Sequence, residues 1–371
     1  MKEKQAIRVT LLLSFLVLVT RGKGISCKKH RQVHKTIQMQ GGDFYDCVDV
    51  NAQPSLNHPR LKDHKIQMQP SSSPLGLDIG PVFEHSVLEV QPSIIECPVG
   101  TVPILRNNRS VTIEAHNIDG LSSIEGEAAG IKYNGEVYGA RAAIAVYEPK
   151  VSKDSKDFSA SWVQISNGGG EHTDKIGVGL EVNPSLSGDT HVRFHIGWTE
   201  GLYKKSCIDH SCPGFVQVDR SIGLGVRMQH VSVYGGTQYV VRVRIFKDPK
   251  SKNWWLTYGK KNTPVGYWPS ALFTFINDKG DLAIWGGIVQ GPTASSNAPQ
   301  MGSGHFASEG FLKAAYIKSM QIMDENNKFV TPEDNSKVSH GTSNSTLYTV
   351  DDFRFGENGM SMFYGGPGVV V

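Results

Sequence analysis

The stretches S-A-S-W-V-Q-I (Ser159–Ile165) and I-G-V-G-L-E-V (Ile176–Val182) alternate apolar residues with polar or small ones. A period of two residues is typical of half-buried strands. Similar segments recur from about Gly130 onward, and K-D-P-K-S-K-N-W-W (Lys247–Trp255) predicts a hairpin turn between two of them. The one helix candidate, around residues 269–275, is short. This pattern predicts an all-β fold, an antiparallel β-sandwich of two packed sheets.

The N-terminal part of the chain has a different composition. Prolines interrupt its strand-like stretches, and Q-P-S-S-S-P-L-G (Gln69–Gly76) resembles a linker. We therefore expect an extended accessory segment over residues 25–115, which lies along a sandwich domain formed by residues 116–371.

The first residues predict the compartment. A basic start is followed by the apolar run V-T-L-L-L-S-F-L-V-L-V (Val9–Val19) and then by small residues, which is the order of a secretory signal peptide over residues 1–24. A membrane anchor is the alternative, but a span needs roughly 20 apolar residues. A net charge of +3 over 371 residues does not indicate nucleic-acid binding. We expect a secreted protein without a membrane anchor.

Cysteine usage agrees with secretion, because an oxidising compartment favours disulfides. Cys207 and Cys212 are close enough in sequence to close a local loop, and Cys47 and Cys97 can close a longer one. This pairing leaves Cys27 without a partner.

Two further features concern metal binding and modification. Zinc ligation by Cys207, His210 and Cys212 is an alternative to a disulfide, but a second Cys/His pair at finger spacing is missing. We predict no metal and no cofactor. N-x-S/T sequons begin at Asn108 and Asn344, and both are candidate glycosylation sites in the secretory pathway.

The common catalytic motifs are missing from the sequence. It contains neither G-x-S-x-G nor H-E-x-x-H, and its thirteen histidines lack ligand spacing. Aromatic residues of the second half can line a binding cleft or fill a sandwich core. The candidates for the cleft are Trp198, Tyr234, Trp285 and His305.

Longer motifs resemble the neprosin family of plant glutamic endopeptidases. D-C-V-D-V-N-A-Q-P-S-L-N-H-P-R-L-K-D-H-K-I-Q-M-Q-P-S (Asp46–Ser71) and E-C-P-V-G-T-V-P-I (Glu96–Ile104) are similar to its activation peptide. V-S-V-Y-G-G-T-Q-Y (Val231–Tyr239), Q-M-G-S-G-H-F (Gln300–Phe306) and F-Y-G-G-P-G (Phe363–Gly368) are similar to the neprosin domain. The resemblance covers nearly everything after the predicted signal peptide.

This resemblance implies a β-sandwich zymogen whose N-terminal propeptide blocks the cleft until it is removed in acid. It also implies cleavage of peptides next to proline by two glutamates. One carboxylate takes a proton from the attacking water, while its protonated partner donates one to the substrate. A shared proton relieves the repulsion between the two.

Both glutamate positions differ in this chain. The first family glutamate lies in a motif similar to I-E-x-G-W before V-x-P, and the matching stretch I-G-V-G-L-E-V-N-P has Gly177 there, with Leu180 at the tryptophan position. The second follows W-G-G, where this chain has Ile288. Glu181 has the parity of Gly177 but lies about 13 Å further along an ideal strand. No intact catalytic pair is predicted, and each lost acid–base group costs roughly 10²–10⁴ in rate.

These observations predict a secreted, monomeric pseudopeptidase of the apoplast or cell wall. It would keep its propeptide in the cleft and bind proline-rich peptides or cell-wall glycoproteins. One alternative is an active acid endopeptidase that uses a relocated carboxylate such as Glu181. The other is a carbohydrate- or cell-wall-binding sandwich, with a row of exposed aromatic side chains on one sheet face.

Overall fold

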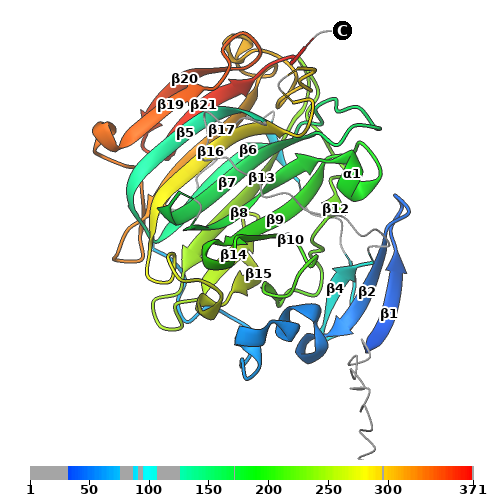
Figure 1. Ribbon diagram of the computed structural model, residues 1–371. Coiled ribbons are helices and arrows are strands. Elements are labelled where there is room, and N and C mark those ends of the chain that lie inside the picture. Colours follow the sequence, from blue (N-terminus) through cyan, green and yellow to red (C-terminus); the bar gives the residue numbers. More distant parts are fainter. Residues whose placement is uncertain are drawn as a thin grey trace, which may run out of the picture. The chain divides into compact units, whose positions relative to one another are not determined.

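The computed structural model describes residues 32–75, 87–90, 95–106, 126–170, 172–294 and 296–369. The predicted signal peptide, Cys27 and Asn108 lie outside these residues. Two large sheets confirm the predicted all-β antiparallel sandwich (Figure 1). Within the part of the chain that is described, no helix is long and apolar enough to cross a membrane.

The first large sheet has eight strands in the order β10-β9-β8-β7-β16-β5-β19, with β12 paired to β9. Its neighbours are antiparallel throughout. The bounds are β5 Gly126–Val137, β7 Phe158–Gly169, β8 His172–Val182, β9 Arg193–Glu200, β10 Lys205–Ile208, β12 Val226–Arg227, β16 Gly280–Gln290 and β19 Val338–Thr342.

The second large sheet has ten strands in the order β11-β15-β14-β13-β6-β17-β21-β20, with β18 paired to β17 and β3 paired to β13. The bounds are β3 Val87–Glu89, β6 Gly139–Ala145, β11 Val216–Gln217, β13 Gln238–Lys247, β14 Trp254–Tyr258, β15 Thr263–Trp268, β17 Ala315–Met323, β18 Phe329–Val330, β20 Thr349–Gly356 and β21 Gly359–Gly365. The hairpin predicted at Lys247–Trp255 is confirmed as the β13–β14 turn.

The core lies between the two sheets because alternate residues of each strand point to the same face. Trp285 of β16 donates its indole N–H to the carbonyl oxygen of Arg141 on β6 at 3.2 Å. The rings of Phe194 on β9 and Tyr258 on β14 meet edge to face, 5.1 Å apart. The predicted helix at 269–275 is only a 3₁₀ turn, η5, over Ser270–Leu272.

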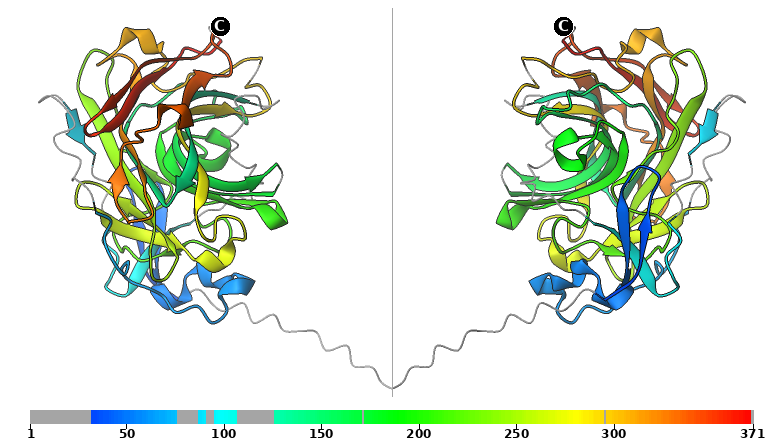
Figure 2. Two further views of the ribbon diagram at one scale, coloured as in Figure 1. Left: turned by 90° about the vertical axis from the view of Figure 1, so that its left-hand side faces the viewer. Right: turned by 90° about the vertical axis from the view of Figure 1, so that its right-hand side faces the viewer.

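Three strands of the N-terminal segment form a small sheet of their own. The antiparallel strands β1 (Val33–Gln38), β2 (Phe44–Asp49) and β4 (Thr101–Leu105) build it, and the predicted Cys47–Cys97 disulfide is confirmed. In Figures 1 and 2 the C-terminal hairpin β20–β21 (orange to red) lies at the opposite end of the sandwich from β1 and β2 (blue).

Polar contacts attach the rest of this segment to the sandwich domain. The side chain of Gln53 donates to the carbonyl oxygen of Gln217 at 3.0 Å and accepts from the backbone N–H of Gln217 at 2.8 Å. Ser71 donates its backbone N–H to the carboxylate of Asp248 at 2.6 Å. Further along, β3 adds a short parallel strand to β13.

Candidate functional site

A single row of side chains crosses the eight-stranded sheet at the position of Ile288. Strand pairing places Ala128 (β5), Ile288 (β16), Ala160 (β7), Glu181 (β8) and Arg193 (β9) directly opposite one another in sequence along this row. Each is buried, and the most exposed of them, Ala128, has 5% of its surface accessible. Since Trp285 faces the other sheet, Ile288, three residues on, faces away from it.

The Ile288 end of the row is apolar. Ile288 belongs to a small cluster, separate from the main core, with Phe158, Ala160, Trp162 and Ile284. The position that the resemblance assigns to an acid therefore lies among hydrocarbon and indole groups. A carboxylate there would lose its hydration without gaining charged partners from this cluster.

Gly177 lies on the same face as Ile288 but in a different row. It pairs with Gln164, and Gln164 pairs with Ile284. Gly177 is thus two strands from Ile288 and displaced by four residues along the strand. Positions 177 and 288 are therefore not directly paired, and the row through Ile288 contains Glu181 instead.

The indole of Trp162 covers the glycines around position 177. A Cβ atom added at Gly177 would lie 2.2 Å from the Trp162 Nε1 atom, and one added at Gly179 would lie 2.6 Å from Cε3. At Gly197 on β9 the closest indole carbon would be 3.3 Å away. Any side chain at position 177, a glutamate included, requires Trp162 to move.

Glu181 is the carboxylate of the Ile288 row, and it is completely buried. The side-chain amide of Asn183 donates to its Oε1 atom at 2.7 Å, and Arg193 is its cross-strand neighbour. Asn183 also caps the short helix α1 (Pro184–Ser187) through its Oδ1 atom. Glu181 is therefore held by the Asn183 amide. The hydrogen-bond partners of the Arg193 guanidinium are Asp43, Asp189 and Gly225.

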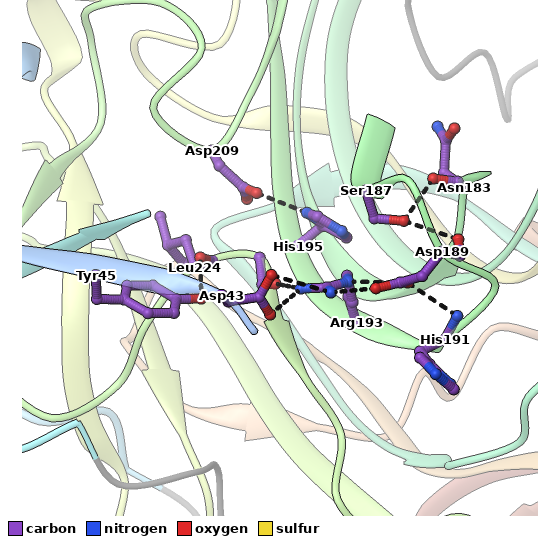
Figure 3. Close-up of polar contacts among 11 residues, drawn as sticks. Asp43, Tyr45, Asn183, Ser187, Asp189, His191, Arg193, His195, Asp209 and Leu224 are labelled. Carbon is purple, nitrogen blue, oxygen red and sulfur yellow. Dashed lines mark hydrogen bonds and ion pairs between the residues drawn. The ribbon is translucent and has the colours of Figure 1, made fainter. Parts of the chain in front are cut away.

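Arg193 joins the sandwich domain to the N-terminal segment (Figure 3). Its Nη1 and Nη2 atoms donate to the two carboxylate oxygens of Asp43 at 2.7 and 3.3 Å. On another edge, Nη2 and Nε donate to Asp189 at 2.6 and 3.4 Å, and Nη1 also donates to the carbonyl oxygen of Gly225 at 2.8 Å. Burial alone would raise the pKa of Asp189, but its hydrogen bond and charge pairing with Arg193 lower it.

A second charged pair lies next to Arg193. His195 Nδ1 is 2.6 Å from Oδ2 of Asp209 (Figure 3). Oδ1 of Asp209 accepts the backbone N–H of Ile196 at 3.0 Å. Burial lowers the pKa of His195, yet the charge and hydrogen bond of Asp209, with a contribution from Glu181, outweigh it and raise that pKa. The protonated imidazole is thus stabilised in the folded protein.

A pocket of about 270 Å³ opens between these charged groups and the N-terminal segment. Phe44 and Leu105 line it from the segment, and Leu186, Arg193 and His195 line it from the sandwich domain. Asp43 and Arg106 of the segment and Asp209 of the domain also line the pocket, so charged groups of both signs lie beside its apolar walls.

Two predicted cleft residues lie elsewhere. Trp198 and Trp285 belong to the main core, with 2% and 0% of their surfaces exposed, and neither lies on the face that carries Ile288. The predicted role is wrong for both because strand parity turns them inward. Gly197 and Ile288, not these tryptophans, occupy the outer face of β9 and β16.

Tyr234 and His305 do come together, but at the surface. Their rings lie 4.2 Å apart, and both bond to Glu309, Tyr234 through its hydroxyl at 2.7 Å and His305 through Nδ1 at 2.9 Å. Neither lines the pocket beside Arg193.

The second predicted disulfide, Cys207–Cys212, is also confirmed. The zinc alternative at these cysteines is therefore wrong, and the described ranges contain no group of three His, Cys, Asp or Glu that could hold a metal ion. Asn344 accepts the hydroxyl of Thr346 at 2.7 Å in its sequon and is partly exposed. Its glycosylation stays a prediction.

Sequence reasoning missed Asp43, Arg193, His195 and Asp209. The parity of V-R-F-H-I-G-W (Val192–Trp198) places Arg193 and His195 on one strand face, and this is the only local signal for them. Asp43 comes from 150 residues earlier in the chain, so the sequence pattern does not connect it to Arg193.

These features define an antiparallel β-sandwich whose N-terminal segment binds through Asp43 to a buried arginine of the eight-stranded sheet. Residues 155–367 match the family model Neprosin, and residues 36–128 match the model of the neprosin activation peptide. The chain belongs to the neprosin family.

Solved structures of scytalido-glutamic peptidase are similar to this chain at low identity. A crystal structure with a transition state analog inhibitor has a TM-score of 0.33 and 9% identity. The match covers 65% of this chain and 98% of the peptidase chain. A second, with a peptide based transition state analog, has a TM-score of 0.32 and 10% identity, with coverage of 66% and 98%.

Proposed function

We propose that this protein is a secreted neprosin-family pseudopeptidase, which binds peptides along the outer face of the eight-stranded sheet without cleaving them. In this proposal residues 25–115 act as a propeptide-like segment that occupies the cleft, and residues 116–371 form the binding domain. The observation that carries the proposal is the apolar cluster around Ile288, at the position where the resemblance expects the second catalytic acid.

The chemistry of the family supports this conclusion. A two-glutamate mechanism needs two carboxyl groups that share one proton around a water molecule. Ile288 has no titratable group, and Trp162 occupies the space beside Gly177. Glu181 lies in the same row as Ile288, but Ile288 offers no second carboxyl group with which Glu181 could share a proton.

The alternative of an active acid endopeptidase rests on Glu181. This carboxylate lies in the same row as Ile288, with Ala160 of the apolar cluster between them. Glu181 would have to act with a second proton donor, for which His195 is the nearest titratable candidate on the adjacent strand.

The carbohydrate-binding alternative receives less support. Such a function expects a row of exposed aromatic side chains on one sheet face. All six tryptophans of the chain lie within the described residues and are buried: Trp162, Trp198, Trp254, Trp255, Trp268 and Trp285. We therefore favour peptides, with proline-rich and cell-wall glycoprotein segments as the ligands to test.

The test is incubation of the acid-treated protein with a proline-rich peptide from pH 3 to pH 7, followed by mass spectrometry. We expect the peptide to bind and to remain intact. Cleavage that disappears in Glu181→Gln and persists in the surface control Glu309→Gln would replace this proposal with the active-endopeptidase alternative.

A further inference from the structure

We propose that the outer edge of the Arg193 guanidinium is a binding site for a carboxylate of a peptide ligand, which Asp43 occupies in the intact chain. This inference rests on the proposed peptide-binding cleft and names the ligand class for one end of it. Figure 3 shows Asp43 from the N-terminal segment and Asp189 from the domain on different edges of the Arg193 side chain.

The donors of Arg193 divide between the two parts of the chain. An arginine has five N–H donors in a rigid fork. Asp189 takes those of Nε and one Nη2 proton, and Gly225 takes one Nη1 proton. The remaining Nη1 and Nη2 protons point in parallel to the two oxygens of Asp43. Without Asp43, the domain leaves a ready-made bidentate donor pair.

Because the Arg193 side chain is buried, this donor pair needs a hydrogen-bond acceptor. Only 3% of the Arg193 side chain is exposed, and a guanidinium stays charged under all ordinary conditions. Buried donors without acceptors are costly, so the edge requires an acceptor or water whenever Asp43 leaves. A planar carboxylate fits the parallel pair better than a neutral carbonyl because both oxygens accept charge-assisted hydrogen bonds.

The surrounding charges favour a singly charged carboxylate over a phosphate. Asp189 already neutralises one edge of Arg193, and the Asp209 carboxylate, paired with His195, faces the same pocket. Glu181 lies on the adjacent strand. Apart from Asp43, the pocket lining contains the acidic Asp209 and the basic Arg106, Arg193 and His195, and Asp46 already pairs with Arg106. A monoanion reproduces the charge that Asp43 supplies, whereas a dianion exceeds it.

The position of Arg193 gives the ligand a spacing. Arg193 ends the row that runs through Glu181 and Ala160 to Ile288. Three strand spacings of about 4.8 Å span about 14 Å, roughly four residues of an extended peptide. We expect the acidic residue, or the C-terminal carboxylate, about four residues from the side chain that lies on Ile288.

The experiment uses the full chain with Asp43→Ala, which removes the internal carboxylate and keeps the hairpin. Binding of three fluorescein-labelled proline-rich peptides is measured by polarisation: one with an internal Asp and an amidated end, its Asn counterpart, and an Asn peptide with a free C-terminal carboxylate. We expect at least one carboxylate peptide to bind about tenfold more tightly than the amidated Asn peptide. Acetate is also expected to raise the melting temperature of Asp43→Ala.

Asp49→Ala is the matched control, because Asp49 lies on the same hairpin but accepts hydrogen bonds from Asn51 and does not line the pocket. It should show no preference for the acidic peptides. Adding Arg193→Gln to Asp43→Ala should abolish the preference. If Asp43→Ala does not fold, Asp43→Ser serves in the same titrations.

The outcomes separate this site from the proposed function. Equal binding of all three peptides keeps the cleft and overturns the carboxylate site, as does a preference that persists in Arg193→Gln. Stabilisation of Asp43→Ala by acetate without binding of any peptide supports the carboxylate site, and it is the result expected if the N-terminal segment still covers the rest of the cleft in this variant. Cleavage of a peptide contradicts the proposed lack of peptidase activity but leaves the carboxylate site unaffected.

Discussion

At the scale of single residues, Trp162 limits which side chains fit at three glycine positions of the eight-stranded sheet. Its indole lies over Gly177, Gly179 and Gly197, so the glycines are a requirement of packing as well as a departure from the family motif. The glycine at position 177 and the placement of Trp162 are therefore two aspects of one arrangement. Under the proposed function, a glutamate introduced at 177 alone would not create a catalytic pair, because Trp162 occupies the space it needs.

Gly177→Ala tests this packing. We expect it to lower the free energy of unfolding by about 1–3 kcal/mol, since the new methyl group would overlap Trp162. Urea unfolding measures the change. Gly341→Ala on β19 is the control, because a Cβ atom there meets nothing within 4 Å, and we expect a change within about 0.5 kcal/mol.

The same substitution in a Trp162→Leu background should cost less than in the native chain, because the smaller side chain leaves room for the methyl group. Equal costs in the two backgrounds would show that Trp162 is not the obstacle.

At the scale of elements, the W-G-G motif (Trp285–Gly287) lies within strand β16. A Cβ atom on Gly286 would lie 2.5 Å from the carbonyl oxygen of Ala129, and one on Gly287 would lie 2.5 Å from the sulfur of Met301. The two glycines thus allow close approaches on opposite faces of the strand.

The strands could be predicted because their period of two is a local property, and the two disulfides followed from the compartment and the spacing of the cysteines. The register could not be predicted, because β16 and β7 lie more than a hundred residues apart in the chain and local patterns do not align them. The sequence places Glu181 about 13 Å along its strand from Gly177. Only the register shows that Glu181 shares a row with Ile288, two strands away.

The β13–β14 turn is an anchor for the N-terminal segment, and its strength depends on pH. Burial would raise the pKa of Asp248, but hydrogen bonds from the hydroxyl and N–H of Ser71, from Lys250 and from Gln67 lower it to about 2. In the unfolded chain an aspartate titrates near 3.9. The contribution of the ionised Asp248 carboxylate to the free energy of unfolding is fully present above about pH 4 and is lost as the pH falls towards about 2.

We therefore expect residues 67–71 to stay docked at pH 5, and Asp248→Asn to release them at that pH. Amide hydrogen exchange at Gln67 and Ser71 reports the change. Asp334→Asn is a matched control, because Asp334 also has a lowered pKa and caps an exposed turn, but its bonds are local, to Ser336. Release at pH 5 in the native chain would contradict this anchor.

At the scale of the whole molecule, the N-terminal segment contributes to the main core. Its buried members in that core are Tyr45, Cys47, Leu61, Val90, Ile95 and Cys97. The hydroxyl of Tyr45 donates to the carbonyl oxygen of Leu224 at 3.0 Å, and that of Tyr258 donates to the carbonyl oxygen of Val90 at 3.1 Å. The segment is thus packed as part of the fold.

The two disulfides should differ in their effect on stability. Cys47–Cys97 joins residues 50 positions apart, whereas Cys207–Cys212 joins residues 5 apart. Loop-closure entropy predicts a loss of about 4 kcal/mol for Cys47→Ala/Cys97→Ala and about 2 kcal/mol for Cys207→Ala/Cys212→Ala. Denaturant unfolding of the two double variants measures both, and the opposite ranking would show that local packing outweighs chain entropy.

The short parallel strand β3 has a consequence for handling the protein. It pairs with Gln238–Val240 of β13, whereas β14 pairs only with Val243–Lys247. A preparation trimmed of its first hundred residues would present this stretch of backbone N–H and C=O groups as a bare sheet margin, a template on which further chains add. Such a product would precipitate or form fibrils on storage, so recombinant production should retain the leading third of the polypeptide.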